Sequence, residues 1–345
     1  MKAVIYNEYQ GPLTIERVKD PQPGPEAVVI EVKATGLCLS DWHGWMGHDP
    51  EIVLPHVPGH ELAGTIVSKG KLVKKWKIGD RVTVPFVGGC GKCDYCYSGN
   101  QQVCDNQFQP GFTAWGSFAE FVRIDYADIN LVALPDYMSF EEAASLGCRF
   151  ITAYRGVRHQ GQLKKGQFIA IHGCGGVGLS AIQIAKGIGA KIIALDITDA
   201  KCEMAQELGA DYAINTMKTN TVDAIKDCSK GGVDVSLDAL GSATTCLNSI
   251  NCLRKRGKHI QIGLMTGEEA HPAIPMSTVI ANELEILGSH GMQAHAYTEM
   301  FQFIKEKEIN LSNLITETIA LEEVPFRLPL LFKEPSLGIT VINSF

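Results

Sequence analysis

The sequence predicts an α/β protein in two parts, with a β-rich domain first and then a domain built on a doubly wound parallel sheet. Three observations predict this class. The chain has 345 residues, which is too long for one small core and favours two domains. Up to about residue 150, short β-branched runs are separated by Gly and Pro, whereas strands and helices alternate beyond that point. Apolar residues make up 45% of the chain and charged residues 20%, as in a soluble globular enzyme.

The first part is expected to form a small, barrel-like antiparallel β domain. Its apolar runs are short, rich in β-branched residues and bounded by turn residues, for example from Pro21 to Pro25. One helix is expected from Ser139 to Leu146. The expected strands are Ala3–Tyr6, Leu13–Val18, Val28–Val32, Leu62–Val67, Arg81–Val84 and Phe118–Ile124.

The second part alternates strands with helices, which is typical of a parallel sheet covered by helices on both faces. After its last strand, the chain mixes a helix, Tyr297–Glu308, with a strand, Gly338–Ile342, and we expect this segment to return to the first domain. The predicted domains are therefore residues 1–150 together with 289–345, and residues 151–288. The expected strands of the sheet are Phe168–His172, Lys191–Leu195, Asp211–Asn215, Val233–Leu237, His259–Ile262 and Leu284–Leu287.

Charge and cysteine content argue against several classes of protein. The net charge of −7 and the dispersed Lys and Arg residues do not suit a nucleic-acid or anionic-membrane surface. The N-terminus lacks a signal-peptide pattern and no apolar run reaches ~18 residues, so we expect a soluble, cytoplasmic protein. Eleven cysteines in a chain of this length favour metal binding by the clustered ones over a disulfide scaffold.

A candidate reactive-metal site lies between Gly36 and Glu61. Cys38 offers a thiolate and His60 an imidazole, which suit Zn²⁺, but two donors must recruit a third or leave positions open. A buried thiol and a core histidine are the alternative interpretation of this pair. For the third donor, Cys148 and Glu61 are both candidates, and Cys148 as a small buried hydrophobe is equally compatible with the sequence.

A second cysteine cluster has the spacing Cys-x2-Cys-x2-Cys-x7-Cys in a loop rich in Gly and polar residues. Four thiolates at this spacing close a tetrahedron around one Zn²⁺ and leave no open position, which predicts a structural site. An iron–sulfur cluster is the chemical alternative. The four residues are Cys90, Cys93, Cys96 and Cys104.

A glycine-rich motif follows the first strand of the second part and opens a helix. Gly173 permits the tight turn, Gly175 lets backbone N–H groups approach a pyrophosphate, and Gly178 lets the helix lie close to the strand. Asp196, 23 positions after Gly173, would bind the adenosine ribose hydroxyls and repel a 2′-phosphate, which favours NAD over NADP. The expected cofactor-binding residues are Gly173, Gly175, Gly176, Val177, Gly178, Asp196 and Lys201.

Taken in order, these motifs resemble those of the zinc-dependent medium-chain alcohol dehydrogenases, and the resemblance covers essentially the whole chain. The motifs are Gly-Leu-Cys-Leu-Ser-Asp-Trp-His, Pro-Gly-His-Glu, the four-cysteine cluster, Leu-Gly-Cys and Gly-Cys-Gly-Gly-Val-Gly. The resemblance implies a GroES-like catalytic domain and a Rossmann domain that enclose a cleft. It also implies two zinc ions per subunit, one structural and one catalytic, with Cys38, His60 and Cys148 as the catalytic ligands.

The same resemblance implies the roles of the remaining site residues. Ser40 matches the hydroxyl that hydrogen-bonds the alcohol, and His43 matches the outer end of the proton relay. Asp41 matches the carboxylate that orients His60, and Glu61 the carboxylate behind the metal. Three aromatic residues are expected to line the substrate pocket, although packing against neighbouring walls is an alternative for each Trp: Phe86, Trp42 and Trp115.

Two positions depart from the family pattern. Leu39 stands where the family often has Arg or His, and Ile339 follows Gly338 where the family often has Arg. Both changes remove positive charge from the expected pyrophosphate site. We therefore expect NAD binding to depend on the helix N-terminus, with modest affinity or fast product release.

The expected function is reversible hydride transfer between a primary or secondary alcohol and NAD, giving an aldehyde or ketone. A polyol (sorbitol-type) dehydrogenase, a zinc-free quinone-reductase-like enzyme and a non-catalytic NAD-binding protein are the alternatives. The sequence does not specify the alcohol. A strand at the end of the second domain, Leu284–Leu287, is available to pair across a two-fold axis, so a homodimer or homotetramer is expected.

Overall fold

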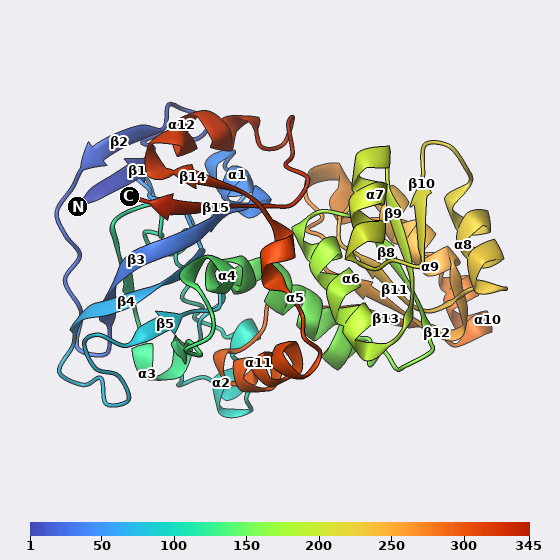
Figure 1. Ribbon diagram of the computed structural model, residues 1–345, viewed down its shortest axis with the longest axis horizontal. Helices are drawn as coiled ribbons and strands as arrows, with labels where there is room; N and C mark the ends of the chain where they lie inside the picture. The colour runs from blue at the N-terminus through green and yellow to red at the C-terminus, as the bar shows by residue number, and fades with distance from the viewer. The chain divides into compact units, whose positions relative to one another are not determined.

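The computed structural model describes all residues from Met1 to Phe345 and divides the chain into two compact units. The first unit contains Met1–Ile151, Gly291–Met300 and Leu314–Phe345. The second unit contains Thr152–His290 and Phe301–Asn313. Both chain termini belong to the first unit, at β1 (Lys2–Ile5) and β15 (Ile339–Ser344) (Figure 1).

The units differ from the expected domains at Ile151, at residues 289–290 and at residues 301–313, and the last of these segments packs with the second unit. The Phe303 ring lies edge-on to Tyr154 with ring centroids 5.5 Å apart, and the Arg158 guanidinium lies over the same ring. Further along, Gln183 Nε2 donates a hydrogen bond to the Asn310 carbonyl at 3.2 Å. These contacts hold the later half of α11 (Tyr297–Glu306) and the residues that follow it against the second unit.

The first unit is a β structure in which every predicted strand is present. Strands β1 and β2 (Thr14–Arg17) form an antiparallel pair. The larger sheet is antiparallel except for one parallel pair, β14 with β15. Its strand order is β14 (Ile315–Ala320), β15, β3 (Val28–Leu37), β4 (Glu61–Lys69), β5 (Arg81–Thr83) and β7 (Val132–Ala133), with β6 (Phe121–Ile124) pairing with β3.

Short helices connect these strands, and they lie mainly in the loops that carry the cysteines. The predicted helix from Ser139 to Leu146 is present as α4 (Phe140–Ser145), begun by a capping box in which Ser139 and Glu142 satisfy each other's backbone N–H groups. The chain then continues through a π-helical turn, η2 (Leu146–Phe150). The other α-helices that lie wholly within this unit are α1 (Leu39–Trp45), α2 (Asp94–Tyr97), α3 (Ala127–Asn130) and α12 (Val324–Arg327).

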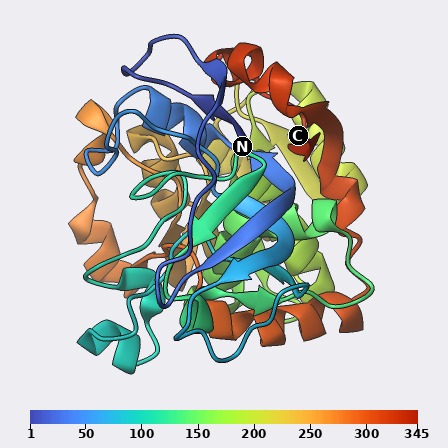
Figure 2. The same ribbon diagram turned by 90° about the vertical axis from the view of Figure 1, so that its left-hand side faces the viewer.

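Strand β3 is an inner strand of the larger sheet, between β15 and β4, and its C-terminal end leads to the candidate site. Its alternate residues Val28, Ile30 and Val32 pack into a buried apolar cluster with residues of β4, β5 and β6. In Figure 2, β3 and β4 run side by side across this unit. Because Gly36 of β3 pairs with Glu61 of β4, the end of one strand and the start of the other meet at the same edge. Residues that follow β3 and precede β4 are therefore brought together.

The second unit confirms the predicted doubly wound parallel sheet. Its six strands are parallel, and the first strand in sequence, β8, lies in the middle of the sheet. This is the strand order of a Rossmann domain. The order is β10 (Tyr212–Asn215), β9 (Lys191–Asp196), β8 (Phe168–His172), β11 (Val233–Asp238), β12 (Leu253–Gln261) and β13 (Glu285–Gly288).

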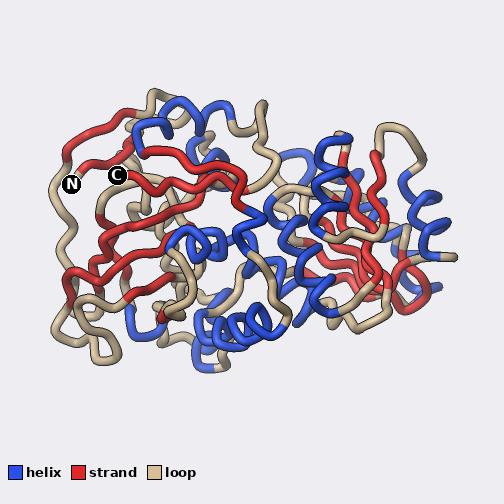
Figure 3. Tube along the Cα trace, viewed as in Figure 1, coloured by secondary structure: helices blue, strands red, loops and turns tan.

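Helices cover both faces of this sheet (Figure 3), and in its two central strands every residue except Phe168 is buried. Every residue of β11 is buried, although its sequence alternates apolar with polar residues, and its buried polar side chains Asp234, Ser236 and Asp238 are hydrogen-bonded. The helices that connect the strands are α6 (Gly176–Ile188), α7 (Asp199–Leu208), α8 (Thr221–Ser229), α9 (Ala243–Asn251) and α10 (Met276–Asn282). None of the helices in the chain has both the length and the apolar character needed to cross a membrane.

Candidate active site

Four side chains of the kinds that ligate metals meet at the end of the first unit's sheet where β3 ends and β4 begins. One ligand atom from each of Cys38, His60, Glu61 and Cys148 lies within 4.8 Å of the others. The first three residues are buried and Cys148 is partly buried. The structure thus brings together the two donors that the sequence identified and both candidates for the third.

Asp41 explains how the separated Cys38 and His60 are held in register. Its Oδ2 accepts a hydrogen bond from the Cys38 backbone N–H at 3.0 Å, which caps the first turn of α1. Its Oδ1 accepts hydrogen bonds from His60 Nδ1 at 2.8 Å and from the Gly59 backbone N–H at 3.0 Å. The carboxylate therefore joins the end of β3 to the start of β4, as a residue that orients a metal-binding histidine should.

The donor set fits zinc. Because Nδ1 of His60 is engaged by Asp41, its Nε2 is the ring nitrogen left for a metal, and this atom is buried with no hydrogen-bond partner. A buried nitrogen without a partner is costly, and a metal ion at this point would satisfy it. The pKa of Cys38 lies well below its ordinary value. A hydrogen bond from Cys148 lowers it most and the charge of Arg149 lowers it further, whereas burial acts in the opposite direction. Two sulfur donors and one imidazole are the ligands of a catalytic zinc with an open position.

Arg149 is a site residue that the sequence analysis did not identify. It follows Cys148 in η2, and its guanidinium and backbone N–H bond the Glu61 carboxylate. Burial opposes the charge on Arg149, but the Glu61 carboxylate outweighs it and raises the pKa of the guanidinium above its ordinary value. The available signal was a charged residue inside the apolar run from Leu146 to Ala153.

Ser40 and His43, the predicted relay residues, both lie on α1 directly after Cys38. Ser40 Oγ lies 3.8 Å from Cys38 Sγ. His43 Nδ1 shares a hydrogen bond of 2.8 Å with Nδ1 of His48, a residue that the sequence analysis did not include. Burial, and to a smaller extent His48, lowers the pKa of His43, which favours the neutral imidazole that accepts a proton.

The three predicted pocket aromatics lie in different surroundings. The Phe86 ring lies edge-on to His60 with centroids 6.1 Å apart, whereas the Trp42 ring stacks on Phe332 at 4.7 Å. Trp115 donates its Nε1–H to the Pro55 carbonyl and lines a cavity of about 300 Å³ whose other walls include none of the metal-binding residues. One aromatic beside the site was not singled out, namely Phe112, whose ring centroid is 5.1 Å from that of His60.

The four cysteines of the second cluster also converge, with sulfur atoms within 4.8 Å of one another. Backbone N–H groups surround them: Cys90 and Asn106 donate to Cys104 Sγ, and Lys92 donates to Cys90 Sγ, at 3.3 to 3.4 Å. No disulfide forms among them, although Cys93 Sγ lies only 3.6 Å from Cys104 Sγ. Four convergent thiols supported by N–H donors fit a tetrahedral metal ion.

The glycine-rich turn of the second unit has the geometry that the motif predicts. Gly173 has a φ of +95°, Gly175 caps α6, and a Cβ at position 178 would clash with the Gly173 carbonyl. Asp196 ends β9, and its Oδ2 accepts a hydrogen bond from the Cys174 backbone N–H at 2.9 Å and lies 3.8 Å from Lys201 Nζ. The acidic residue is thus held against the turn, at the carboxyl edge of the sheet, where dinucleotides bind in this fold.

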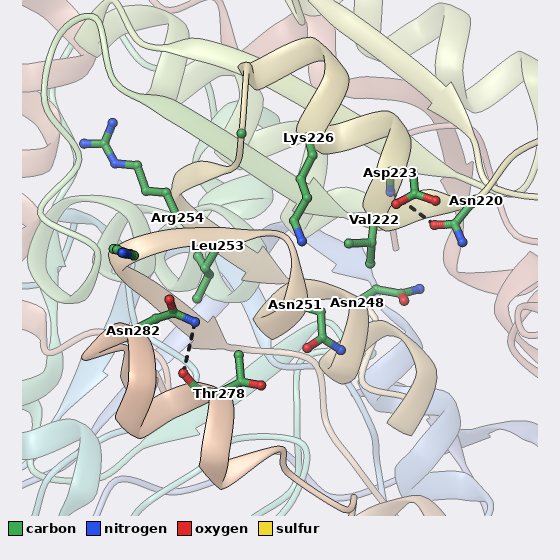
Figure 4. Close-up of a pocket in the computed structure, with 12 residues that line it drawn as sticks. Asn220, Val222, Asp223, Lys226, Asn248, Asn251, Leu253, Arg254, Thr278 and Asn282 are labelled. Carbon is green, nitrogen blue, oxygen red and sulfur yellow. Dashed lines mark hydrogen bonds between the residues drawn. The ribbon is translucent and has the colours of Figure 1, made fainter.

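Figure 4 shows a separate polar pocket of about 940 Å³ in the second unit. It is lined by residues of α8, α9 and α10, among them Lys226, Asn248 and Asn251, and by Leu253 at the start of β12. The starts of parallel strands share one edge of a sheet and their ends share the other. This pocket therefore lies at the edge opposite the glycine-rich turn, and none of the predicted site residues lines it.

Comparisons with known proteins agree with this architecture. Residues 24–136 match the family model described as alcohol dehydrogenase GroES-like domain, and residues 176–306 match the model described as zinc-binding dehydrogenase. An alcohol dehydrogenase of Geobacillus stearothermophilus is 34% identical over 328 residues, with 94% of each chain covered. A sorbitol dehydrogenase of Halalkalibacterium halodurans is 31% identical, again with 94% of each chain covered. Among solved structures, the alcohol dehydrogenase TADH from Thermus sp. ATN1 has a TM-score of 0.91 and 28% identity, with 100% of both chains covered.

The fold, the two cysteine-rich clusters and the glycine-rich turn define a zinc-binding oxidoreductase. The chain belongs to the zinc-dependent medium-chain alcohol dehydrogenase family. This confirms the family that the sequence motifs resemble, and with it the expected combination of a GroES-like and a Rossmann domain.

Proposed function

We propose that the protein catalyses reversible hydride transfer between a primary or secondary alcohol and NAD, yielding an aldehyde or ketone. The observation that carries the proposal is the convergence of Cys38, His60 and Cys148 on one point, with the His60 Nε2 atom buried and unpartnered. This donor set is that of a catalytic zinc rather than a structural one. Zinc and NAD, when bound, would supply a Lewis acid that lowers the pKa of the alcohol hydroxyl and an acceptor for the hydride.

The residues of the chain have distinct roles in this proposal. Asp41 orients the His60 ring so that Nε2 faces the ligand cluster. The Ser40 hydroxyl, next to Cys38 at the start of α1, takes up the proton that leaves the substrate hydroxyl and gives up its own proton to the relay that ends at His43. His43, three residues further along α1, passes a proton toward solvent, and its lowered pKa keeps it neutral and able to accept one. Phe86 and Phe112, whose rings pack around His60, form an apolar wall for the substrate.

A second zinc is proposed for the four-cysteine cluster, giving two zinc ions per chain. Four converging thiols fill a tetrahedron, so this metal has no open position and serves the fold alone. Zinc is favoured over an iron–sulfur cluster because one domain then uses a single metal for both of its sites.

NAD is proposed as the preferred cofactor. The Asp196 carboxylate lies at the end of β9 beside the glycine-rich turn, where it would bind the ribose hydroxyls and repel a 2′-phosphate. Lys201, 3.8 Å from Asp196, is proposed to contact the same ribose. Leu39 and Ile339 have aliphatic side chains, so neither supplies positive charge to the pyrophosphate. The N-terminus of α6 is then the main anion-binding element.

A polyol dehydrogenase is the second candidate. A sorbitol dehydrogenase is among the relatives, and the Glu61 carboxylate, a candidate third ligand, lies within the metal-binding cluster. A panel of alcohols distinguishes the two candidates: NAD⁺ reduction by ethanol, 2-propanol and benzyl alcohol at higher kcat/KM than by sorbitol or xylitol supports the alcohol dehydrogenase. Higher kcat/KM for the polyols would replace it with the second candidate, and no NADH from any alcohol would remove both.

Assembly into a homodimer or homotetramer is also proposed. Strand β13 ends the order of the sheet in the second unit, and no other strand of the chain pairs with its outer side, so this side is available to the same strand of a second copy. Light scattering coupled to size-exclusion chromatography tests this, because a monomer at micromolar concentration would contradict it.

A further inference from the structure

Four ligand atoms converge in the metal-binding cluster, one more than a catalytic zinc needs. Such a site uses three protein ligands and keeps its fourth position open for substrate. Cys38 and His60 are common to every assignment, so the identity of the third ligand depends on whether Cys148 or Glu61 reaches the metal. The sequence leaves this choice open, but the contacts of Glu61 bear on it directly.

Both oxygens of the Glu61 carboxylate are bonded to Arg149. Oε1 accepts hydrogen bonds from the Arg149 backbone N–H at 3.1 Å and from its Nε at 3.0 Å, and Oε2 pairs with Nη2. This is the two-point geometry in which a guanidinium holds a carboxylate most firmly. The Glu61 side chain is fully buried and that of Arg149 is 8% exposed, so water does not compete for the pair.

Two features of the backbone fix the position of this ion pair. A Cβ at Gly36, on the adjacent strand β3, would clash with both Glu61 Oε2 and Arg149 Nη2, so β3 forms a close wall behind the pair. Cys148 and Arg149 lie together in the π-helical turn η2. The wider π turn lets two successive residues face the same cluster, the first offering its sulfur and the second its guanidinium.

We propose that Arg149 is a positioning residue that restrains Glu61 and thereby makes Cys148 the third protein ligand of the catalytic metal. This inference rests on the proposed catalytic zinc site. With Arg149 in place, Glu61 has its charge compensated and both oxygens occupied, so it gains little by binding the metal. Without Arg149, the buried carboxylate would lack its ion-pair partner, and a metal ion held by Cys38 and His60 would be the cation within its reach.

Cobalt(II) substitution at the catalytic site of the full-length protein tests the proposal, because the near-ultraviolet charge-transfer absorbance per cobalt rises with the number of thiolate ligands. We expect Arg149→Gln to lose this absorbance as Glu61 replaces Cys148 on the metal. The double variant Glu61→Gln/Arg149→Gln, which removes both buried charges, should regain the parent spectrum. Arg123→Gln, which breaks an exposed ion pair with Asp125 in the same unit, is the matched control and should leave the spectrum unchanged.

Three results would overturn the proposal: an unchanged spectrum for folded Arg149→Gln, equal loss in the single and double variants, or a loss in the control.

Cys148→Ala gives a second test that keeps the ion pair intact and does not depend on Arg149→Gln folding. Since Glu61 is restrained in this variant, the catalytic site should lose cobalt while the four-cysteine cluster keeps its zinc. Full cobalt occupancy in Cys148→Ala would contradict the proposal. Failure of the parent protein to bind any metal beyond the four-cysteine cluster would instead remove the proposed function itself.

Discussion

The Asp41 carboxylate and the His60 imidazole are joined by a hydrogen bond of 2.8 Å, although 19 positions separate the two residues in sequence. The same carboxylate bonds the backbone of Cys38 and Gly59. One buried side chain therefore fixes both the ring orientation of the histidine and the start of the helix that follows the cysteine.

Replacing Asp41 with Asn should weaken zinc binding at the catalytic cluster by about 10- to 100-fold. The uncharged amide oxygen accepts the His60 Nδ1–H bond less strongly than the carboxylate, so it holds the His60 ring and its tautomer less firmly. Competition with a chromogenic chelator measures the affinity. Asp49→Asn, on the loop after α1, removes a carboxylate that bonds only the Glu51 backbone and serves as the control. Equal zinc affinity in Asp41→Asn and the parent would contradict the assigned role.

Ser40→Ala should lower turnover by about 10²-fold or more, in line with the loss of a general acid–base group. Zinc content should stay the same, because the nearest ligand atom, Cys38 Sγ, is 3.8 Å from the hydroxyl and does not depend on it. Steady-state kinetics with elemental analysis of the same sample make the comparison. Near-normal turnover would show that protons leave by another route.

Turnover should fall on the acid side of its pH profile as His43 becomes protonated, and we call this fall the acid limb. The pKa of His43 is lowered from the ordinary value of about 6.5, first by burial and then by His48. Because the neutral ring accepts the proton, activity should be present above this lowered pKa and lost as pH falls through it. His48→Asn removes a cation-forming neighbour, so the limb should move to higher pH. An unmoved limb in this variant would mean that His43 does not control it.

Asp196→Asn should reduce the preference for NAD over NADP by about 10- to 100-fold in kcat/KM, since a charge-assisted hydrogen bond to ribose is weakened and the repulsion of a 2′-phosphate is removed. The variant should keep its fold because the amide oxygen can still accept the Cys174 N–H. Kinetics with both cofactors provide the test. Equal use of NAD and NADP by the parent protein would contradict the role of Asp196.

Most of the fold could be predicted from the sequence because its signals are local. Apolar runs bounded by Gly and Pro predicted the strands, and Phe168–His172 was predicted with the bounds that the structure shows. Helix α1 and strand β14 were not predicted. The seven residues of α1 are too few to show an apolar period. Strand β14 pairs only with β15, so it depends on a tertiary contact that its local sequence does not show.

The candidate site was less accessible from sequence wherever it depends on tertiary contacts. Spacing identified Cys38 and His60, but no local pattern shows that Gly36 pairs with Glu61 and brings them together. Arg149 is similarly hidden, because its role comes from a π turn and a residue 88 positions away. The sequence shows that Trp115 is an aromatic residue near a loop, but it does not show which cavity the ring lines, and that cavity contains none of the candidate metal ligands.

The central claim is that the zinc held by Cys38, His60 and Cys148 is required for alcohol oxidation, whereas the zinc of the four-cysteine cluster is required only for the fold. Partial chelation, with zinc content and alcohol-dependent NADH formation measured on the same samples, tests it most directly. Two zinc ions per chain are expected at the start, one in each cluster. Activity should fall in proportion to the zinc lost from Cys38, His60 and Cys148, and it should return when zinc is added. Full activity in protein that retains only the four-cysteine zinc would contradict it.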